Sequence, residues 1–203
     1  LLIEFQGLAA SSAHDANYFD GTLNAQGPSA RSLRSYYQEV SLGRLTVNAT
    51  IVPTWWRSGE TMAHYGQDSG SGVDDANGPI YALVTEAVQA ADPSFNFAPF
   101  DTDNDGVIDH LLVVHAGAGQ ENTAGNPDLI WSHRWAVLDA NSSVSGSQPL
   151  TADGVQVYGY IMTSEDSPIG VVTHEFGHDL GLPDLYDTDP SSFGVGVWDV
   201  MGT

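Results

Sequence analysis

The chain has 203 residues, 41% of them hydrophobic, which is enough to bury a substantial core, and the sequence predicts one domain spanning residues 1–203. A formal net charge of -21 would repel nucleic acid and anionic membranes, so both are excluded as partners. The absence of cysteine excludes disulfides and thiolate metal ligands, and no apolar run is long enough to insert into a membrane. A monomer is the default expectation.

Apolar periodicity and turn residues predict strands and helices that alternate along the chain. In chain order we expect a strand at 1–5, a helix at 29–40, a strand at 45–53, a loop at 66–78, a helix at 80–91, a strand at 107–115, a turn at 116–119, strands at 129–135 and 155–162, and a helix from about 168. Ser167 or Asp166 is the expected cap of this last helix, with Pro168 in its first turn. The sum is an α/β (α+β) fold in which a twisted sheet backs the last helix.

The acidic stretch at 101–109 predicts a calcium site. Carboxylates at Asp101, Asp103, Asp105 and Asp109, a glycine for the bend and the backbone carbonyl of Val107 reproduce the first half of an EF-hand loop. The twelfth position holds leucine instead of glutamate, so the loop is not an EF-hand. A solvated acidic turn is the alternative, but carboxylates packed so closely repel one another without a cation.

Other polar residues have weaker patterns. For Asp68, Asp74 and Asp75 in the loop at 66–78, solvated side chains are expected in preference to a further ion site. The histidines in or near strands, His110, His115 and His133, are expected to be core residues or to lie behind the metal ligands. Glu121 follows the glycine-rich turn and is expected to border the cleft.

Residues 174–184 read His-Glu-Phe-Gly-His-Asp-Leu-Gly-Leu-Pro-Asp and predict a zinc peptidase site. Residues four apart share one face of a helix, so His174 and His178 can bind the same ion. Glu175 would lie beside the metal without binding it, where its carboxylate can take a proton from an attacking water. Gly181 permits the left-handed backbone that ends the helix, and the turn returns Asp184 as the third ligand. An amphipathic helix with two uninvolved histidines is the alternative.

Three residues near this motif are candidates for supporting roles. Met201 lies in a glycine-flanked turn, where its thioether can form an apolar floor beneath the imidazoles, although a plain core methionine is the alternative. For Tyr186 a packing role is expected, and a reach toward the metal or the substrate oxyanion is the alternative. Asp179 follows the second histidine and can orient a neighbouring group by a hydrogen bond.

Together these motifs resemble the catalytic domain of the immune inhibitor A family of secreted bacterial zinc metallopeptidases, a metzincin-like (zincin) group. The segments that carry the resemblance cover nearly the whole chain: LLIEF at 1–5, SLRSYY at 32–37, SLGRL at 41–45, DTDNDG at 101–106, DHLLVVHAG at 109–117, IWSHRW at 130–135, and the zinc segment with PDLYD at 183–187. Asp184 in place of a third histidine is similar to this family's variant. The resemblance implies a lower C-terminal subdomain that is truncated here, and the absence of a leader predicts a processed fragment.

The sequence therefore predicts a secreted zinc endopeptidase that hydrolyses polypeptide substrates, with Zn²⁺ and Ca²⁺ as cofactors. An extended substrate is expected to lie along a sheet edge by strand addition. The alternative is a calcium-stabilised binding or adhesion module that keeps a zincin fold without activity. The presence of Glu175 argues against this alternative.

Overall fold

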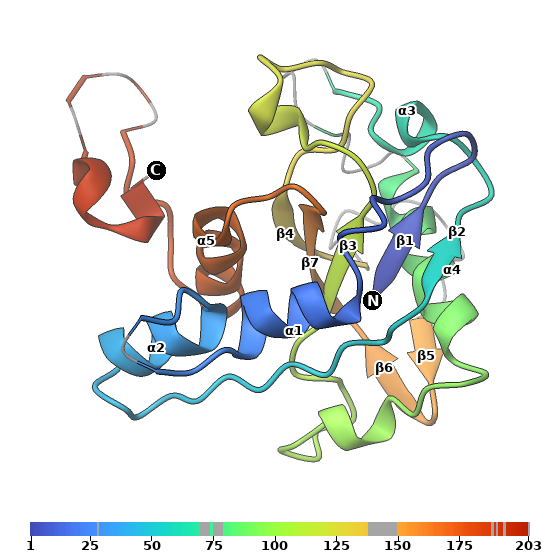
Figure 1. Cartoon of the computed structure of the whole chain (residues 1–203), viewed down its shortest axis with the longest axis horizontal. Coiled ribbons are helices and arrows are strands. Elements are labelled where there is room, and N and C mark those ends of the chain that lie inside the picture. The colour runs from blue at the N-terminus through green and yellow to red at the C-terminus, as the bar shows by residue number, and fades with distance from the viewer. Residues whose placement is uncertain are drawn as a thin grey trace.

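A computed structural model describes residues 1–27, 29–69, 74, 79–137, 150–187, 189, 191–192 and 194–202. Its centre is a five-stranded twisted sheet of order β2-β1-β3-β7-β4, in which β4 is antiparallel to β7 and the other pairs are parallel (Figure 1). The strands are β1 (Leu2–Glu4), β2 (Trp55–Arg57), β3 (Leu112–His115), β4 (His133–Ala136) and β7 (Gly159–Ser164). A hairpin of β5 (Leu150–Ala152) and β6 (Val155–Val157) forms a second sheet. This architecture confirms the predicted mixed α/β fold class.

Helices cover both faces of the sheet (Figure 1). On one face lies α4 (Ile80–Ala91), which the sequence predicts with the same bounds, and the short α3 (Met62–Tyr65) contacts it. On the other face lie α1 (Ala16–Asn24), α2 (Leu33–Val40) and α5 (Ile169–Asp179). Single turns of 3-10 helix occur at Ala98–Phe100, Gln120–Asn122, Gly196–Trp198 and Val200–Gly202.

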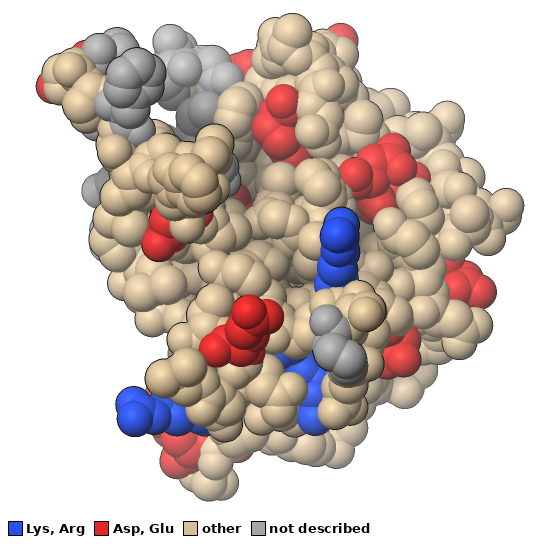
Figure 2. All heavy atoms as spheres, turned by 60° about the vertical axis from the view of Figure 1, so that its left-hand side comes forward, with Lys and Arg blue, Asp and Glu red and all other residues tan. Residues whose placement is uncertain are grey.

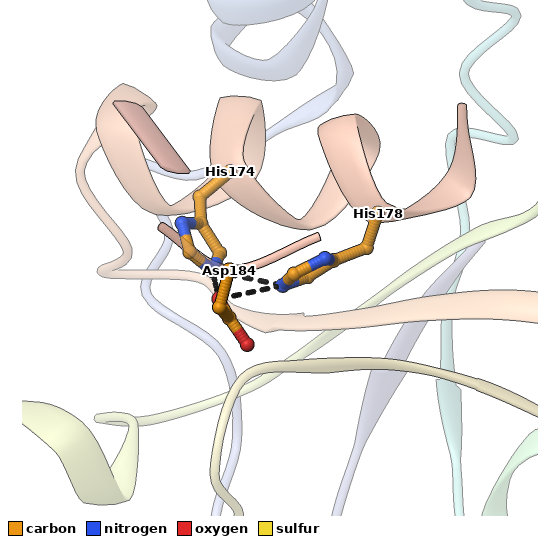
Figure 3. A group of neighbouring side chains, drawn as sticks. All are labelled: His174, His178 and Asp184. Carbon is orange, nitrogen blue, oxygen red and sulfur yellow. Dashed lines mark hydrogen bonds and ion pairs between the residues drawn. The ribbon is translucent and has the colours of Figure 1, made fainter. Parts of the chain in front are cut away.

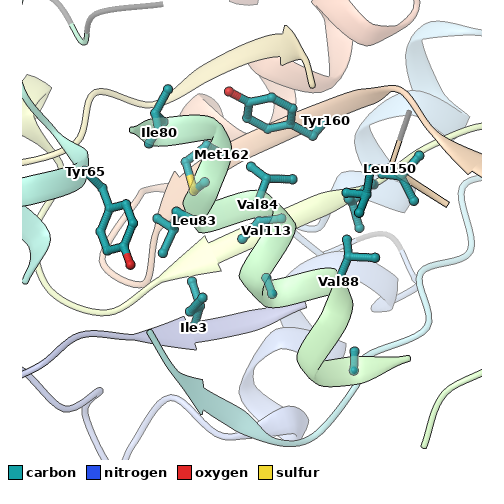
Figure 4. Close-up of a cluster of buried hydrophobic side chains, with 14 of the residues drawn as sticks. Ile3, Tyr65, Ile80, Leu83, Val84, Val88, Val113, Leu150, Tyr160 and Met162 are labelled. Atoms are coloured by element: carbon teal, nitrogen blue, oxygen red, sulfur yellow. The ribbon is translucent and has the colours of Figure 1, made fainter. Parts of the chain in front are cut away.

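The main core lies between α4 and the sheet (Figure 4). Successive strand residues point to opposite faces, so Ile3 and Val113 meet α4 while Leu2 and Val114 belong to the cluster on the other side. On α4, Leu83 is 0% exposed. Burying a side chain of this size contributes about 1.5–3 kcal/mol, so this face alone supplies much of the folding free energy.

The second core fixes α5 against the sheet. Phe176 packs with Ile161 of β7 and with Tyr37 of α2, whose ring centroid lies 5.1 Å from that of Phe176. The Tyr37 hydroxyl donates a buried hydrogen bond of 2.8 Å to the carbonyl of Thr173. The strand β7 and the helix α2 therefore both pack against the inner face of α5, and its opposite face does not take part in this core.

The predicted strand at 45–53 is wrong, because residues 45–54 belong to no strand or β-bridge. Its apolar residues Leu45, Val47, Ala49 and Ile51 are partly buried against the second core, so the alternation is present in the burial. The backbone of Ala49 instead bonds the side chain of Asn24 at 2.8 Å through both its N–H and its carbonyl. Apolar and polar residues alternate here because one side of the segment is partly buried, and such burial does not require a neighbouring strand.

Several predicted boundaries also need correction. The helix predicted at 29–40 begins at Leu33, because Ser32 and Ser35 form a reciprocal capping box. The strand predicted at 107–115 begins only at Leu112, after the acidic loop, and the strand predicted at 129–135 is β4. The strand predicted at 155–162 is two strands, β6 and β7, which belong to different sheets. The elements α1, α3, β2 and β5 have no counterpart among the predicted ones.

The predicted cap of α5 is also wrong. Pro168 is the N-cap residue, and neither Ser167 nor Asp166 makes a side-chain cap bond to the helix. The Ser167 hydroxyl is instead turned back toward β7, where it accepts a hydrogen bond from the backbone N–H of Ser164 at 3.0 Å. The Ser167 hydroxyl therefore bonds the end of β7 instead of capping α5.

Candidate metal centre

The helix α5 ends as predicted, in a turn that reverses the chain at Gly181. Gly181 has a φ of 88°, and its N–H donates to the carbonyl of His178 at 2.9 Å. The N–H of Leu182 donates to the carbonyl of Gly177 at 3.0 Å, which completes a Schellman motif. Because the chain reverses here, Asp184 returns toward the face of α5 that carries the two histidines.

The three predicted zinc ligands meet at one point (Figure 3). An Asp184 carboxylate oxygen lies 3.2 Å from the Nε2 atom of His174 and 3.2 Å from that of His178. The two Nε2 atoms are 3.0 Å apart. One turn of helix separates the imidazoles, and the loop supplies the carboxylate.

The outer nitrogen of each imidazole is held by backbone. His174 Nδ1 lies 2.8 Å from the carbonyl of Val200, and His178 Nδ1 lies 2.9 Å from the carbonyl of Leu182. A carbonyl can only accept, so each Nδ1 must carry its proton, which leaves both Nε2 lone pairs facing Asp184. Two lone pairs and a carboxylate that converge in this way repel one another unless a cation lies between them. The residues present therefore fit a divalent metal ion with nitrogen and oxygen ligands.

Glu175 lies next to this group and is buried, with 6% of its surface exposed. Burial raises the pKa of Glu175 above its usual value and outweighs the opposite effect of the neighbouring His174 and His178. Such a carboxylate binds a proton more readily than an exposed one, which is the property that a general base requires.

Met201 packs against α5 and is 2% exposed. It closely approaches Gly177, where a Cβ atom would lie only 2.5 Å from the Met201 sulfur and 3.2 Å from the Tyr37 hydroxyl oxygen. Gly177 is thus a supporting residue that was not among the predicted ones. Its signal was a glycine inside a helix, a costly choice that usually has a packing reason.

The two remaining candidates near the motif differ in their contacts. Tyr186 is 44% exposed, and burial together with a hydrogen bond to Asp184 raises the pKa of its hydroxyl. The hydrogen-bond partners of the Asp179 side chain are not the predicted metal-binding residues. Its carboxylate accepts from Arg134 Nε at 2.9 Å and bonds His110 Nδ1 at 2.5 Å, so the groups that it orients are these two.

Glu121 is close enough to Glu175 for its charge to contribute to the raised pKa of that residue. Its carboxylate accepts bonds from the Ser132 backbone N–H at 3.1 Å and from the Ser132 hydroxyl at 2.7 Å. His115 is a core histidine with 0% of its surface exposed, whereas the His133 side chain is 20% exposed, and burial lowers the pKa of both.

The acidic loop brings together three of its predicted calcium ligands. Asp101, Asp103 and Asp105 each offer an oxygen, and these oxygens lie within 4.8 Å of one another. The three carboxylates also accept bonds from backbone N–H groups of the loop, including that of Val107. Asp109 is not in this cluster, because its carboxylate is turned toward Thr102. The predicted set is therefore reduced by one carboxylate.

The expectation of solvated carboxylates in the loop at 66–78 is wrong for Asp74. Its side chain is 7% exposed, accepts a bond from the backbone N–H of Trp131 at 3.0 Å, and its Cα pairs with that of Asp68 across an antiparallel bridge. Burial raises the pKa of Asp74 to about 7. The Asp74 carboxylate is therefore held at the backbone of Trp131, where little of it is exposed to water. Asp75 lies outside the described residues.

The charged groups on the visible surface are mainly carboxylates (Figure 2). They are spread over the face shown instead of being gathered in one patch, and arginines are few. Within the described part of the chain, no helix has the length and apolar character needed to cross a bilayer.

Residues 12–203 match the family model described as the immune inhibitor A peptidase M6 catalytic domain. Immune inhibitor A of Bacillus thuringiensis subsp. alesti is 37% identical over 198 residues, which cover 86% of this chain and 28% of that protein. The pre-pro-metalloprotease PrtV of Vibrio cholerae serotype O1 is 34% identical over 208 residues, which cover 90% of this chain and 22% of that protein. The chain thus spans less than a third of the length of these relatives.

Proposed function

This chain belongs to the immune inhibitor A family of metallopeptidase catalytic domains, and on that premise we propose that it forms one zinc-dependent endopeptidase domain. The observation that supports the proposal best is the convergence of two imidazole Nε2 atoms on one oxygen of Asp184, 3.2 Å from each. Three protein ligands leave a coordination position open, which is typical of catalytic zinc sites, whereas structural sites are closed by a fourth ligand.

A zinc ion held by His174, His178 and Asp184 would polarise the scissile carbonyl and lower the pKa of a water molecule. Glu175 accepts the proton that this water loses as its oxygen attacks the carbonyl carbon. The same carboxylic acid then delivers the proton to the leaving amine, so that it ends the cycle ionised. Its burial and raised pKa support both roles, because a carboxylate that binds a proton more readily can hold it between the two steps.

We further propose that an extended polypeptide binds by strand addition along the free edge of β4. The sheet has two edge strands, β2 and β4, and α5 contacts β4 and its neighbour β7. Among the described residues β4 pairs only with β7, so no described strand occupies its other edge. A peptide paired there would lie beside the helix that carries the zinc ligands.

Two finer parts of the proposal concern calcium and location. Asp101, Asp103 and Asp105 would hold a calcium ion that offsets their mutual repulsion and braces the loop before β3. A net charge of -21 and the absence of cysteine and lysine suit a secreted protein that stays soluble outside the cell.

The test is cleavage of casein by the parent protein, by Glu175→Ala, and by the parent after treatment with a zinc chelator. We expect the variant and the chelated protein to lose nearly all activity, and zinc should restore only the chelated parent. Cleavage by Glu175→Ala at the parent rate would show that another group is the base. Full cleavage by metal-free protein would refute the metallopeptidase mechanism.

A further inference from the structure

The segment IWSHRW at 130–135 contains a charged residue that the proposed mechanism does not use. Arg134 lies in β4, and its Nε donates to Asp179 Oδ1 at 2.9 Å. Asp179 is the last residue of α5 and directly follows the zinc ligand His178. One ion pair therefore joins the end of the zinc helix to the edge strand of the sheet.

The Asp179 carboxylate is buried and has a partner on each oxygen. Its side chain is 4% exposed, and Oδ2 lies 2.5 Å from His110 Nδ1. Burial raises the pKa of Asp179, but the bonds from His110 and Arg134 outweigh burial and lower it below the usual value. A carboxylate held in this way cannot rotate without losing a charge-assisted bond, so it is a rigid connection between the two elements.

The arginine is also confined on the strand side. Its guanidinium lies over Gly159 of β7, where a Cβ atom would come within 3.1 Å of the Nη2 atom. Gly159 pairs with Ala136 of β4, so the neighbouring strand leaves room for the guanidinium. Arg134 thus spans from β4 across the end of β7 to α5 without a competing side chain at that position.

We infer that Arg134 and Asp179 are positioning residues that fix the distance between the outer edge of β4 and the proposed zinc ligands on α5. The inference rests on the proposed function, in which a substrate pairs with this edge while its scissile bond lies at the metal. A peptide aligned on β4 reaches the ligands in the right place only if strand and helix keep their spacing. Displacements of about 1 Å from productive geometry can cost about 100-fold in rate.

The test compares a long fluorogenic peptide, which extends along β4 on both sides of the scissile bond, with a short one that has few residues beyond it. Arg134→Gln and Asp179→Asn should lose about 10–100-fold in kcat/KM on the long peptide while retaining zinc, and should lose much less on the short peptide. Arg134→Lys should retain more activity than Arg134→Gln, because an ammonium group keeps the charge. The double variant should be little worse than either single variant, because both remove the same link.

A matched control lies at the opposite edge of the sheet. The Arg57 guanidinium pairs with Glu4, joining β2 to β1, so Arg57→Gln removes a similar ion pair far from β4. Its kinetics on both peptides should equal those of the parent. If Asp179→Asn fails to fold, Arg134→Gln decides the question, because Arg134 is 34% exposed and its loss leaves no cavity in the core.

The inference is overturned if zinc-loaded Arg134→Gln equals the parent on both peptides. It is also overturned if both peptides lose activity by the same factor as zinc is lost, since that result indicates a merely structural ion pair. A parent no more active than Glu175→Ala would refute the proposed function itself, and the positioning role with it.

Discussion

Replacing Gly177 with alanine tests the close packing beneath the metal centre. A Cβ atom at this position would lie 2.5 Å from the Met201 sulfur, closer than such atoms approach in folded proteins. Overpacking of a buried site costs about 1–3 kcal/mol, and alanine in a helix recovers about 1 kcal/mol relative to glycine. The net expectation is a loss of up to about 2 kcal/mol in the free energy of unfolding.

The same helix offers a matched control at Gly170. It is exposed, and a Cβ atom there would meet nothing within 4 Å, so Gly170→Ala should keep only the gain in helix propensity. The difference in stability between the two variants therefore isolates the overpacking cost of about 1–3 kcal/mol. In a domain of this size that difference corresponds to about 2–4 °C in Tm for each kcal/mol.

The clash should also reach the metal. Met201 adjoins Val200, whose carbonyl holds His174 Nδ1 at 2.8 Å, so a displaced Met201 should weaken zinc binding in Gly177→Ala. The measurements are urea unfolding of the metal-free proteins and zinc affinity by competition with a chelator. Adding Met201→Ala to Gly177→Ala should recover part of the stability, because the small side chain removes the contact. Equal stability of Gly177→Ala and Gly170→Ala would refute the packing beneath the helix.

Three further predictions concern ions and pH. Asp184→Ala should retain zinc much less well in metal analysis, because two protein ligands remain, and unchanged affinity would remove Asp184 from the site. Calcium at about a hundred times its Kd should stabilise the parent by about 2.7 kcal/mol beyond sodium chloride of equal ionic strength, and the effect should vanish in Asp103→Ala with Asp105→Ala; equal responses would leave only a solvated loop. Burial lowers the pKa of His115 to about 4 from 6.5, so the unfolded chain binds a proton at this residue more readily than the folded chain does. The contribution of the neutral His115 to the free energy of unfolding is therefore present above pH 6.5 and is lost as the pH falls toward 4. Urea unfolding in the presence of a chelator should show that His115→Asn loses less free energy of unfolding than the parent between pH 6.5 and 4. Equal losses in the two proteins would show that His115 does not cause the pH dependence.

The parts of the molecule that could be predicted from sequence are those set by local rules. The His174 and His178 spacing needs only one turn of helix, and Gly181 marks a turn that few other residues adopt. The helix α4 has the predicted bounds because its apolar residues recur on one face. In each case the deciding contacts lie within a few residues along the chain.

The parts that could not be predicted depend on distant partners. The segment 45–53 alternates as a strand does, but whether a ladder forms depends on whether a neighbouring strand lies beside it. The helix α1 buries only Phe19 and Leu23, so its sequence has little apolar periodicity to detect. The bond of Asp179 to Arg134 joins residues 45 positions apart, and no local pattern at either residue encodes it.

The order of strands in the sheet also determines how late in the chain its centre can form. β1 lies between β2 and β3, so Leu2 must wait for its partner Val114, more than a hundred residues away along the chain. β7, which pairs with β3 and packs against α5, begins only at Gly159. Closing such long loops before any pairing rewards them makes parallel sheets slow to fold. The predicted metal ligands follow β7 in the chain, and α5 packs on that strand, so we expect the candidate site to form only after this slow step.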